Sequence, residues 1–586
     1  MLLCICIKNK GGDIIYSRVY SEAIRGIEPY VVCIEVDITN GIPVINMVGL
    51  LSSEVKESKE RVRTALKNSG NNIPPSRVTI SFSPANEHKE GTGFDLAIAV
   101  AILNATNELK IEDISEYIFI GELRLDGSIK GINGILPLVN NAKNMGYKYV
   151  VLSDENYREA RLVKGIKIIP ICNLNFLKEY FDNNSENKEH IDKIRGDDYS
   201  TNSTNSNFNS ISKKIYNNSG NNTNIKSNNN KNSNININNI DDSTIVNNES
   251  DNVCVDYKDI FGQEAAKYAC VYAACGWHNL FMIGPPGSGK SILARGISSI
   301  MDEMSEEESI EVSNVHSICG LLKNGRLVRK RPFYAPHHSI TLPSLIGGGK
   351  FVVPGAITIA NKGVLFLDEL TEFQSNVLDG LRQPLEEKSI KIHRLSGDYV
   401  FPADCLVVAA TNPCKCGYYP DRSRCNCTEN EIKRYFGKVS GPILDRMDIS
   451  VEVSRVSEEF ISYVSESESY NNISKIKESE KINKLNGYRV LSTYDMKKLV
   501  KKGCDFAKKR QGNKKNANLT MDEIRKYCYL GKAEKDFMMD AYVKFGLTMR
   551  GYYKVIKVSR TIADIEESES IEVRHLIKAL AYRLTI

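Results

Sequence analysis

Apolar and polar positions along the first part of the chain follow both strand and helix periods. Residues 30–37 and 77–82 are short runs rich in β-favouring residues, and they predict strands. Residues 53–66 mix charged and apolar positions at helical spacing, which predicts an amphipathic helix. Residues 93–103 are mostly apolar and predict a helix buried on more than one face. The pattern favours an α+β region, and no His, Cys or carboxylate cluster in it has a catalytic spacing.

The pattern breaks down over residues 183–252, where Asn, Ser, Lys, Ile and Asp dominate. Such a segment buries too little apolar surface to offset its conformational entropy, so it predicts a disordered linker. An Asn-rich aggregating or regulatory element is the alternative. The break separates the α+β region from a longer C-terminal region.

The composition limits the class of protein and the cellular compartment that the chain can belong to. The length of 586 residues allows several domains. The net charge of +5 provides no global basic field, so any nucleic-acid contact must come from local patches. Fifteen cysteines without an export signal indicate reduced thiols. The apolar start is too short for a signal peptide, and no stretch reaches the roughly 20 apolar residues of a membrane span. We therefore expect a cytoplasmic protein without membrane segments.

The strongest chemical signal is a phosphate-binding loop. It fits the pattern G-x-x-x-x-G-K-[ST], and it consists of Gly284, Pro285, Pro286, Gly287, Ser288, Gly289, Lys290 and Ser291. An apolar strand at 279–283 precedes it and a helix begins at 292–297, so its amides face an anion at a helix N-terminus. In this pattern Lys290 reaches the terminal phosphates of ATP and Ser291 ligates Mg²⁺. A glycine turn with a chance lysine is the alternative.

Two further apolar strands end in polar residues. The strand in 362–369 ends in Asp368 and Glu369, an arrangement that P-loop ATPases use to hold Mg²⁺ and to polarise water. The strand in 406–412 ends in Asn412, which could align the same water. A solvated acidic pair and a turn before proline are the alternatives.

Four cysteines follow in two C-x-C pairs, Cys414, Cys416, Cys425 and Cys427. Four thiolates suffice for a tetrahedral structural Zn²⁺, although C-x-C is tighter than the usual spacing. Reduced unliganded cysteines or a disulfide are the alternatives. A bound metal would display Tyr418, Arg422 and Arg424 on a rigid knuckle suited to nucleic acid.

Several longer motifs resemble the ComM/YifB family of magnesium-chelatase-like AAA+ proteins. They cover residues 37–43, 55–62, 89–96, 121–127, 331–339, 440–448 and 547–564. The resemblance implies an α+β ribosomal S5-like, Lon-protease-like domain, an α/β P-loop AAA+ core with a helix-2 insert and a hairpin before sensor 1, and an all-α lid. The implied boundaries are an extension at 1–14, the Lon-like domain at 15–182, the linker at 183–252, the core at 253–455 with its cysteine knuckle at 414–427, and the lid at 456–586.

The resemblance also implies residue roles. Asn412 corresponds to sensor 1, Arg446 to an arginine finger acting on a neighbouring subunit's nucleotide, and Arg550 to sensor 2. Arg434 is a second finger candidate. A salt bridge of Arg446 with Asp445 or Asp448 is the structural alternative.

Other family positions differ in this chain. The serine and lysine of the Lon dyad correspond to Gly93 and Leu136, which supply neither nucleophile nor base, so peptidase activity is not expected. The usual second arginine of the 331–339 motif is Tyr334. The adjacent His337 and His338 favour a loop or substrate contact over a metal site.

The function that the resemblance implies is an ATP-driven, hexameric DNA translocase, specifically a branch-migration helicase of natural transformation. A hairpin predicted at 389–402 carries Lys391 and Arg394, which are placed to meet DNA phosphates. Two other classes stay open, a magnesium-chelatase-like metal-insertion motor and an AAA+ protein remodeller.

Overall fold

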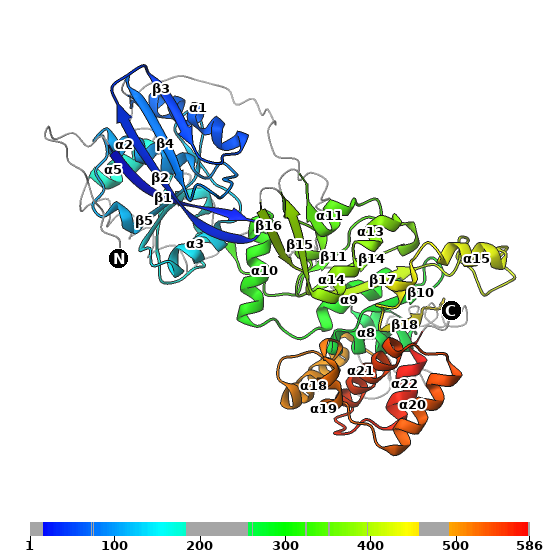
Figure 1. Cartoon of the computed structure of the whole chain (residues 1–586). Helices are drawn as coiled ribbons and strands as arrows, with labels where there is room; N and C mark the ends of the chain where they lie inside the picture. Colours follow the sequence, from blue (N-terminus) through cyan, green and yellow to red (C-terminus); the bar gives the residue numbers. More distant parts are fainter. Residues whose placement is uncertain are drawn as a thin grey trace, which may run out of the picture. The chain divides into compact units, whose positions relative to one another are not determined.

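The computed structural model describes residues 16–71, 73, 75–182, 256–260, 262–322, 325–349, 352–394, 397–455 and 491–583. The predicted extension at 1–14, the predicted linker at 183–252 and the start of the predicted lid, 456–490, lie outside these residues. The chain divides into two compact units (Figure 1). The first contains residues 16–182 except 24–28 and 133–137, and the second contains those two segments together with residues 256–583.

A seven-stranded mixed sheet forms the centre of the first unit, in the order β3-β4-β2-β1-β5-β8-β9. Its strands are β1 Tyr16–Arg25, β2 Glu28–Thr39, β3 Val44–Val48, β4 Arg77–Ser83, β5 Tyr117–Ile120, β8 Tyr149–Ser153 and β9 Lys167–Ile171. β2 pairs with β4 antiparallel, whereas β3–β4, β1–β5, β5–β8 and β8–β9 are parallel. The runs at 30–37 and 77–82 coincide with β2 and β4.

Helices pack on this sheet, and the ranges are α1 Ser53–Asn68, α2 Asp95–Ala105, α3 Ile135–Asn144, α4 Tyr157–Ala160 and α5 Leu174–Asp182, with 3-10 turns η1 Ile114–Glu116 and η2 Asp154–Asn156 and a small ribbon, β6 Glu122–Leu123 with β7 Ile129–Lys130. α1 begins after Ser52, whose side chain accepts a hydrogen bond from the Val55 N–H and caps the helix. α2 is buried at every position except Asn104, as its mostly apolar sequence predicts. The buried Asp95 carboxylate is held by Arg61 at 2.8 Å.

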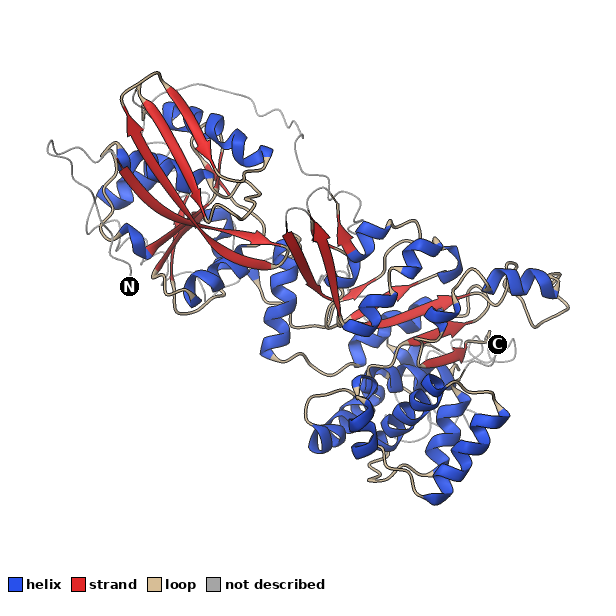
Figure 2. Ribbon diagram, viewed as in Figure 1, coloured by secondary structure: helices blue, strands red, loops and turns tan. Residues whose placement is uncertain are grey.

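A five-stranded sheet forms the centre of the second unit, in the order β11-β14-β17-β10-β18 (Figure 2). Its strands are β10 Leu280–Ile283, β11 Phe333–Tyr334, β14 Val364–Leu367, β17 Leu406–Thr411 and β18 Ile449–Glu452. All four neighbouring pairs are parallel. Parallel strands are buried on both faces, and the uniformly apolar β10, β14 and β17 fit that position.

Helices and short elements surround this sheet: η4 Tyr257–Asp259, α8 Glu264–Gly276, α9 Lys290–Ile300, α10 Glu306–Ile318, α11 Leu342–Ile346, α12 Ala356–Ile359, η6 Leu370–Glu372, α13 Ser375–Asp379, α14 Arg382–Glu387, α15 Glu429–Phe436, α16 Gly441–Leu444, and the two-stranded pair β12 Gly347–Gly348 with β13 Val353–Pro354. β15 Ser389–Arg394 and β16 Gly397–Pro402 form an antiparallel hairpin where the sequence predicted one. The middle of its turn, 395–396, lies outside the described residues.

The C-terminal part of the unit, residues 491–583, is helical (Figure 2). It contains α18 Thr493–Gln511, η9 Asn516–Asn518, α19 Met521–Tyr527, α20 Lys532–Lys544, α21 Met549–Ile565 and α22 Val573–Ala581. α21 is buried throughout its second half, from Val558 to Ile565, and carries the buried pair Arg560 and Asp564. This helix therefore lies at the centre of the helical part.

Candidate nucleotide-binding site

The carboxyl ends of three neighbouring parallel strands bring the predicted site together. Ile283 at the end of β10 pairs with Thr411 at the end of β17, and Leu367 at the end of β14 pairs with Ala409. Because parallel strands end at the same sheet edge, the loops after all three strands meet there. The phosphate loop, the acidic pair and Asn412 follow these strand ends.

The phosphate loop has a backbone that depends on glycine at three positions. Gly287 and Gly289 have φ values of +75° and +92°, which side chains rarely adopt. A Cβ on Gly284 would lie 2.2 Å from the Val453 carbonyl oxygen, so the close approach of β18's continuation also requires glycine. Within the described residues the buried Ser288 hydroxyl has no hydrogen-bond partner. An unsatisfied hydroxyl in this loop fits a ligand that supplies acceptors.

Lys290 begins α9 and is only 8% exposed. Its Nζ donates to the carbonyl oxygens of Gly284 at 2.6 Å and Pro285 at 2.9 Å, and to Asn412 Oδ1 at 3.2 Å. Burial lowers the pKa of Lys290, and the negative charges of Asp368 and Glu369 oppose that effect. The ammonium group thus lies where the loop, β17 and the acidic pair converge.

Ser291 and Asp368 are joined directly, since the Ser291 Oγ donates to Asp368 Oδ2 at 2.6 Å. A hydroxyl and a carboxylate at this distance are both hard oxygen ligands of the kind that Mg²⁺ prefers. The residues present fit a Mg²⁺ ion, which Ser291 and Asp368 would hold.

Glu369, two residues after the end of β14, occupies a left-handed backbone conformation with φ of +50°. Its Oε2 lies 3.5 Å from Nδ1 of His338, and its side chain is 57% exposed. The sequence offered no specific role for His338, and its place beside Glu369 emerged only from the fold. His337 instead makes a local contact, with its Nδ1 2.8 Å from the Ser339 hydroxyl.

The two arginines predicted to act on phosphate lie together. Arg446 Nη2 is 2.8 Å from Glu386 Oε1, and Arg550 Nη2 contacts the same atom. Arg446 also donates to the Pro442 carbonyl oxygen at 2.7 Å. Within the described residues neither arginine forms a hydrogen bond or ion pair with Lys290, Ser291 or Asp368. The second finger candidate, Arg434, is exposed on α15.

The structural alternative for Arg446, a salt bridge with Asp445 or Asp448, is wrong. Asp448 instead accepts from the Asn279 N–H at 3.0 Å and pairs with Lys554 at 3.1 Å. Burial raises the pKa of Asp448, but Lys554 and His278 outweigh burial and the net shift is downward. Arg446 pairs instead with Glu386.

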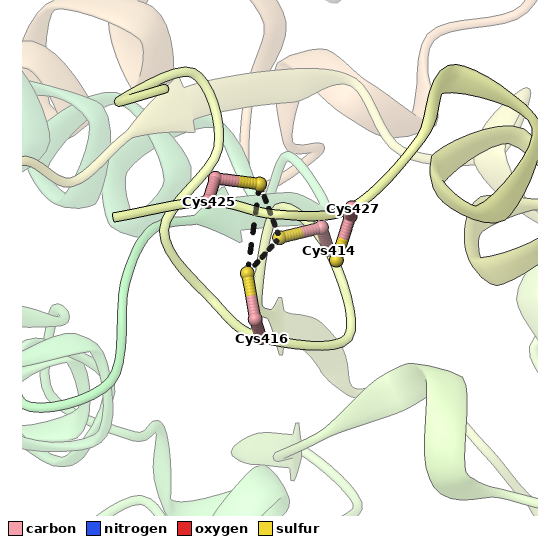
Figure 3. Close-up of side chains that lie close together, drawn as sticks. All are labelled: Cys414, Cys416, Cys425 and Cys427. Atoms are coloured by element: carbon pink, nitrogen blue, oxygen red, sulfur yellow. Dashed lines mark hydrogen bonds between the residues drawn. The ribbon is translucent and has the colours of Figure 1, made fainter. Parts of the chain in front are cut away.

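The four cysteines of the two C-x-C pairs form one cluster, and their side chains point toward one another (Figure 3). All four Sγ atoms lie within 4.8 Å of one another. The separations are 3.2 Å for Cys414–Cys416, 3.7 Å for Cys414–Cys425 and 3.5 Å for Cys416–Cys425. The cysteines are free thiols, so the disulfide alternative does not describe this structure.

The positions that correspond to the Lon dyad are Gly93, just before α2, and Leu136, near the start of α3. Leu136 is buried, and Gly93 packs so closely that a Cβ would lie 3.0 Å from Ile132. Both positions serve packing.

Comparison with known proteins matches this architecture part by part. The family model for magnesium chelatase, subunit ChlI, matches residues 256–461, which include the phosphate loop, Asp368, Glu369, Asn412 and Arg446. A model for subunit ChlI of Mg-chelatase matches residues 34–156, and one for the C-terminal part of subunit ChlI matches residues 491–583. The chain is 34% identical to competence protein ComM of Haemophilus influenzae over 568 residues, 97% of each chain. The chain belongs to the ComM/YifB family of magnesium-chelatase-like proteins.

Two further relatives are similar to this ComM/YifB protein over different lengths. It is 32% identical to protein YifB of Escherichia coli over 570 residues, 97% of each chain. It is also 30% identical to Lon protease 2 of Bacillus subtilis over 120 residues, 20% of this chain and 21% of that protein. Family membership implies an ATPase that uses ATP and Mg²⁺. In the part of the chain that the structure describes, every helix is too short or too polar to cross a bilayer.

Proposed function

We propose that this ComM/YifB protein is a hexameric, ATP-driven DNA translocase, and specifically a branch-migration helicase that acts on recombination intermediates. The observation that carries the ATPase part is the convergence of Lys290, Ser291, Asp368 and Asn412 at one sheet edge. The DNA part is supported by full-length similarity to a protein named for competence.

In the proposed chemistry, the amides of 284–291 and Lys290 bind the ATP phosphates, while Ser291 and Asp368 hold Mg²⁺. Glu369 orients or deprotonates the attacking water, and Asn412 positions it as sensor 1. The Glu369 carboxylate is exposed at the sheet edge, where it can reach a water. His338, 3.5 Å from that carboxylate, is placed to fix its orientation.

The active site is composite in this proposal. Arg446, the finger, and Arg550, sensor 2, share Glu386, and among the described residues neither forms a hydrogen bond or ion pair with Ser291 or Asp368 of its own chain. Arg446 is assigned to the nucleotide of a neighbouring subunit, and an arginine that acts between subunits implies a ring. A finger arginine of this kind accelerates hydrolysis by about three to five powers of ten in other NTPases.

DNA contact is assigned to two cationic features of the second unit. The hairpin β15–β16 exposes Lys391 and Arg394, and the cysteine knuckle exposes Arg422 and Arg424. Lysine and arginine contacts to phosphate supply sequence-independent affinity, which a motor moving along DNA needs. The knuckle's cysteines are assigned to a structural Zn²⁺.

The predicted boundaries complete the proposal: Lon-like domain 15–182, AAA+ core 253–455 with helix-2 insert and pre-sensor-1 hairpin, and lid 456–586. The Lon-like domain is assigned a scaffolding or substrate-contacting role without peptidase activity, since Gly93 and Leu136 lack the required groups. We place the protein in the cytoplasm.

A metal-insertion motor is the second candidate, because the three family models that match are those of magnesium chelatase. Stimulation of ATP hydrolysis distinguishes the two candidates. The proposal expects single-stranded or branched DNA to raise the ATPase rate of the full chain, with binding that weakens steeply as salt increases.

Matched variants connect that stimulation to the hairpin. Lys391→Ala with Arg394→Ala lowers DNA stimulation and the salt dependence, whereas Lys526→Ala, an exposed lysine on α19, leaves both unchanged. Absence of DNA binding and stimulation at low salt contradicts the proposal. Stimulation by a protein partner alone supports the metal-insertion motor or an AAA+ protein remodeller.

A further inference from the structure

The cysteine cluster has the dimensions of a zinc site. A tetrahedral site with Zn–S bonds of about 2.3 Å places its sulfurs about 3.8 Å apart. The Sγ separations of 3.2, 3.5 and 3.7 Å among Cys414, Cys416 and Cys425 lie close to that edge length, and the fourth sulfur lies within 4.8 Å of the others (Figure 3). Cys414 and Cys425 are buried, and Cys416 and Cys427 are half-buried.

Apart from turn hydrogen bonds and one from Arg422 to the Cys427 carbonyl oxygen, the knuckle has only a small core to hold its shape. Residues 412–427 contain neither helix nor strand. Its apolar core consists of Cys414, Cys425 and Ile432, with Tyr418 and Phe436 packed against them. A loop with so small a core opens easily, so a cross-link through four sulfurs would be its main source of rigidity.

This knuckle packs directly against the phosphate loop. Gly417, between the second cysteine and Tyr418, has φ of +84°. A Cβ on Gly417 would lie 2.5 Å from Cδ and 2.9 Å from Cγ of Pro286, the third residue of the phosphate loop. The knuckle backbone therefore lies on the loop with no space for a side chain.

A second connection runs through Arg455, after β18. Its guanidinium lies 5.0 Å above the Tyr418 ring and its Nη2 donates to the Pro286 carbonyl oxygen at 3.4 Å. A third connection is covalent, because Asn412, which contacts Lys290, is only two residues before Cys414. The knuckle is therefore connected to the phosphate loop directly through Gly417 on the Pro286 ring, and indirectly through Arg455 and Asn412.

We propose that Cys414, Cys416, Cys425 and Cys427 bind one Zn²⁺ whose occupancy controls ATP affinity by bracing the phosphate loop. The inference rests on the proposed ATPase function of that loop and adds a metal-dependent control to it. With zinc, the Cys416–Tyr418 turn is rigid and keeps Pro286 and the loop amides in the phosphate-binding conformation. Without zinc, the turn loosens, and part of the free energy of nucleotide binding is used to order the phosphate loop.

The first test measures metal and nucleotide together on the full chain. Elemental analysis is expected to give one zinc per wild-type chain and per Cys172→Ser chain, and none after Cys416→Ser with Cys427→Ser. A chelator selective for Zn²⁺ over Mg²⁺ should weaken binding of a fluorescent ATP analogue at least tenfold, and added Zn²⁺ should restore it. Wild-type protein without zinc, or an unchanged Kd after zinc removal, overturns the proposal.

The second test leaves the metal in place, so that it stays informative if the cysteine variants fail to fold. Gly417→Ala pushes a methyl group toward Pro286 and should weaken ATP binding at least tenfold while retaining one zinc. Gly512→Ala is the matched control, because Gly512 also has positive φ, +69°, but a Cβ there meets no atom within 4 Å. Equal ATP affinity in the two variants overturns the bracing contact.

Failure of the proposed function gives a different result. Zinc-loaded wild-type chain that binds no ATP refutes the ATPase assignment. Zinc-dependent ATP binding without DNA stimulation refutes the DNA motor but supports the brace.

Discussion

Arg446 and Arg550 donate to the same carboxylate oxygen, Oε1 of Glu386. Arg446 follows α16, and Arg550 lies in the first turn of α21. Although burial acts in the opposite direction, the two guanidinium groups lower the pKa of Glu386. Two arginines converging on one anionic oxygen form a geometry that also suits a phosphate oxygen.

The first prediction concerns these arginines. Arg446→Ala should reduce kcat about a thousandfold or more while leaving ATP bound, because the finger stabilises charge that develops only in the transition state. Mixing Arg446→Ala chains with Lys290→Ala chains should restore part of the ATPase rate, since some interfaces then combine an intact loop with an intact arginine. Mixtures as inactive as their components contradict action between subunits.

The second prediction concerns Glu369. Glu369→Gln should bind ATP with unchanged affinity and lower kcat at least a hundredfold, because the amide cannot accept a proton from water. Binding of a fluorescent ATP analogue and phosphate release measure the two effects. Glu372→Gln, on the following 3-10 turn, is the matched control and should hydrolyse ATP normally. Near-normal turnover by Glu369→Gln would refute its role.

The third prediction concerns the pH dependence of the first unit. Burial raises the pKa of Glu22 to about 8, although the Asn141 amide, which donates at 3.0 Å, opposes it. Between pH 4.5 and 8 the folded chain therefore keeps a proton on Glu22 that the unfolded chain releases. The stability that this group contributes is complete below pH 4.5 and is lost as the pH rises toward 8.

Glu22→Gln has no ionisable side chain, so it removes the loss of stability that wild type shows as the pH rises. At pH 8 the variant should exceed wild type in local unfolding free energy by roughly 3 to 5 kcal/mol, with little difference near pH 4.5. Hydrogen exchange of peptides covering β1 measures this at both pH values. The exposed Glu28→Gln serves as control, and a difference that does not change with pH contradicts the prediction.

The fourth prediction concerns a buried network in the helical part. Asp564 is fully buried and accepts from Arg510 at 2.9 Å, Arg560 at 3.0 Å and Asn516 at 2.8 Å. Asp564→Ala leaves the buried Arg560 without its carboxylate and should destabilise the chain by about 3 to 5 kcal/mol. Thermal unfolding followed by fluorescence of Trp277, the single tryptophan, reports the loss. Asp540→Ala, exposed on α20, should unfold like wild type.

Local sequence was sufficient for the parts of the site that depend on neighbouring residues. Residues 284–291 predict their own turn because Gly287 and Gly289 permit positive φ there and Lys290 starts a helix. The apolar runs before Asp368 and Asn412 predict strands for the same reason, since side-chain pattern along a strand is a local property. The sequence therefore shows that Asp368 and Asn412 follow the ends of strands, but it does not show which other residues they meet.

Contacts between distant segments required the tertiary structure. The parallel order β14-β17-β10 decides that Asp368 meets Ser291 and that Asn412 meets Lys290. Nothing in the sequence near Glu386 marks it as the partner of Arg446 and Arg550, and nothing near Gly417 shows that it lies on Pro286. The sequence by itself determined the local backbone and the chemistry of each motif. Packing decided which motifs meet, because that depends on strand order and burial summed over the whole unit.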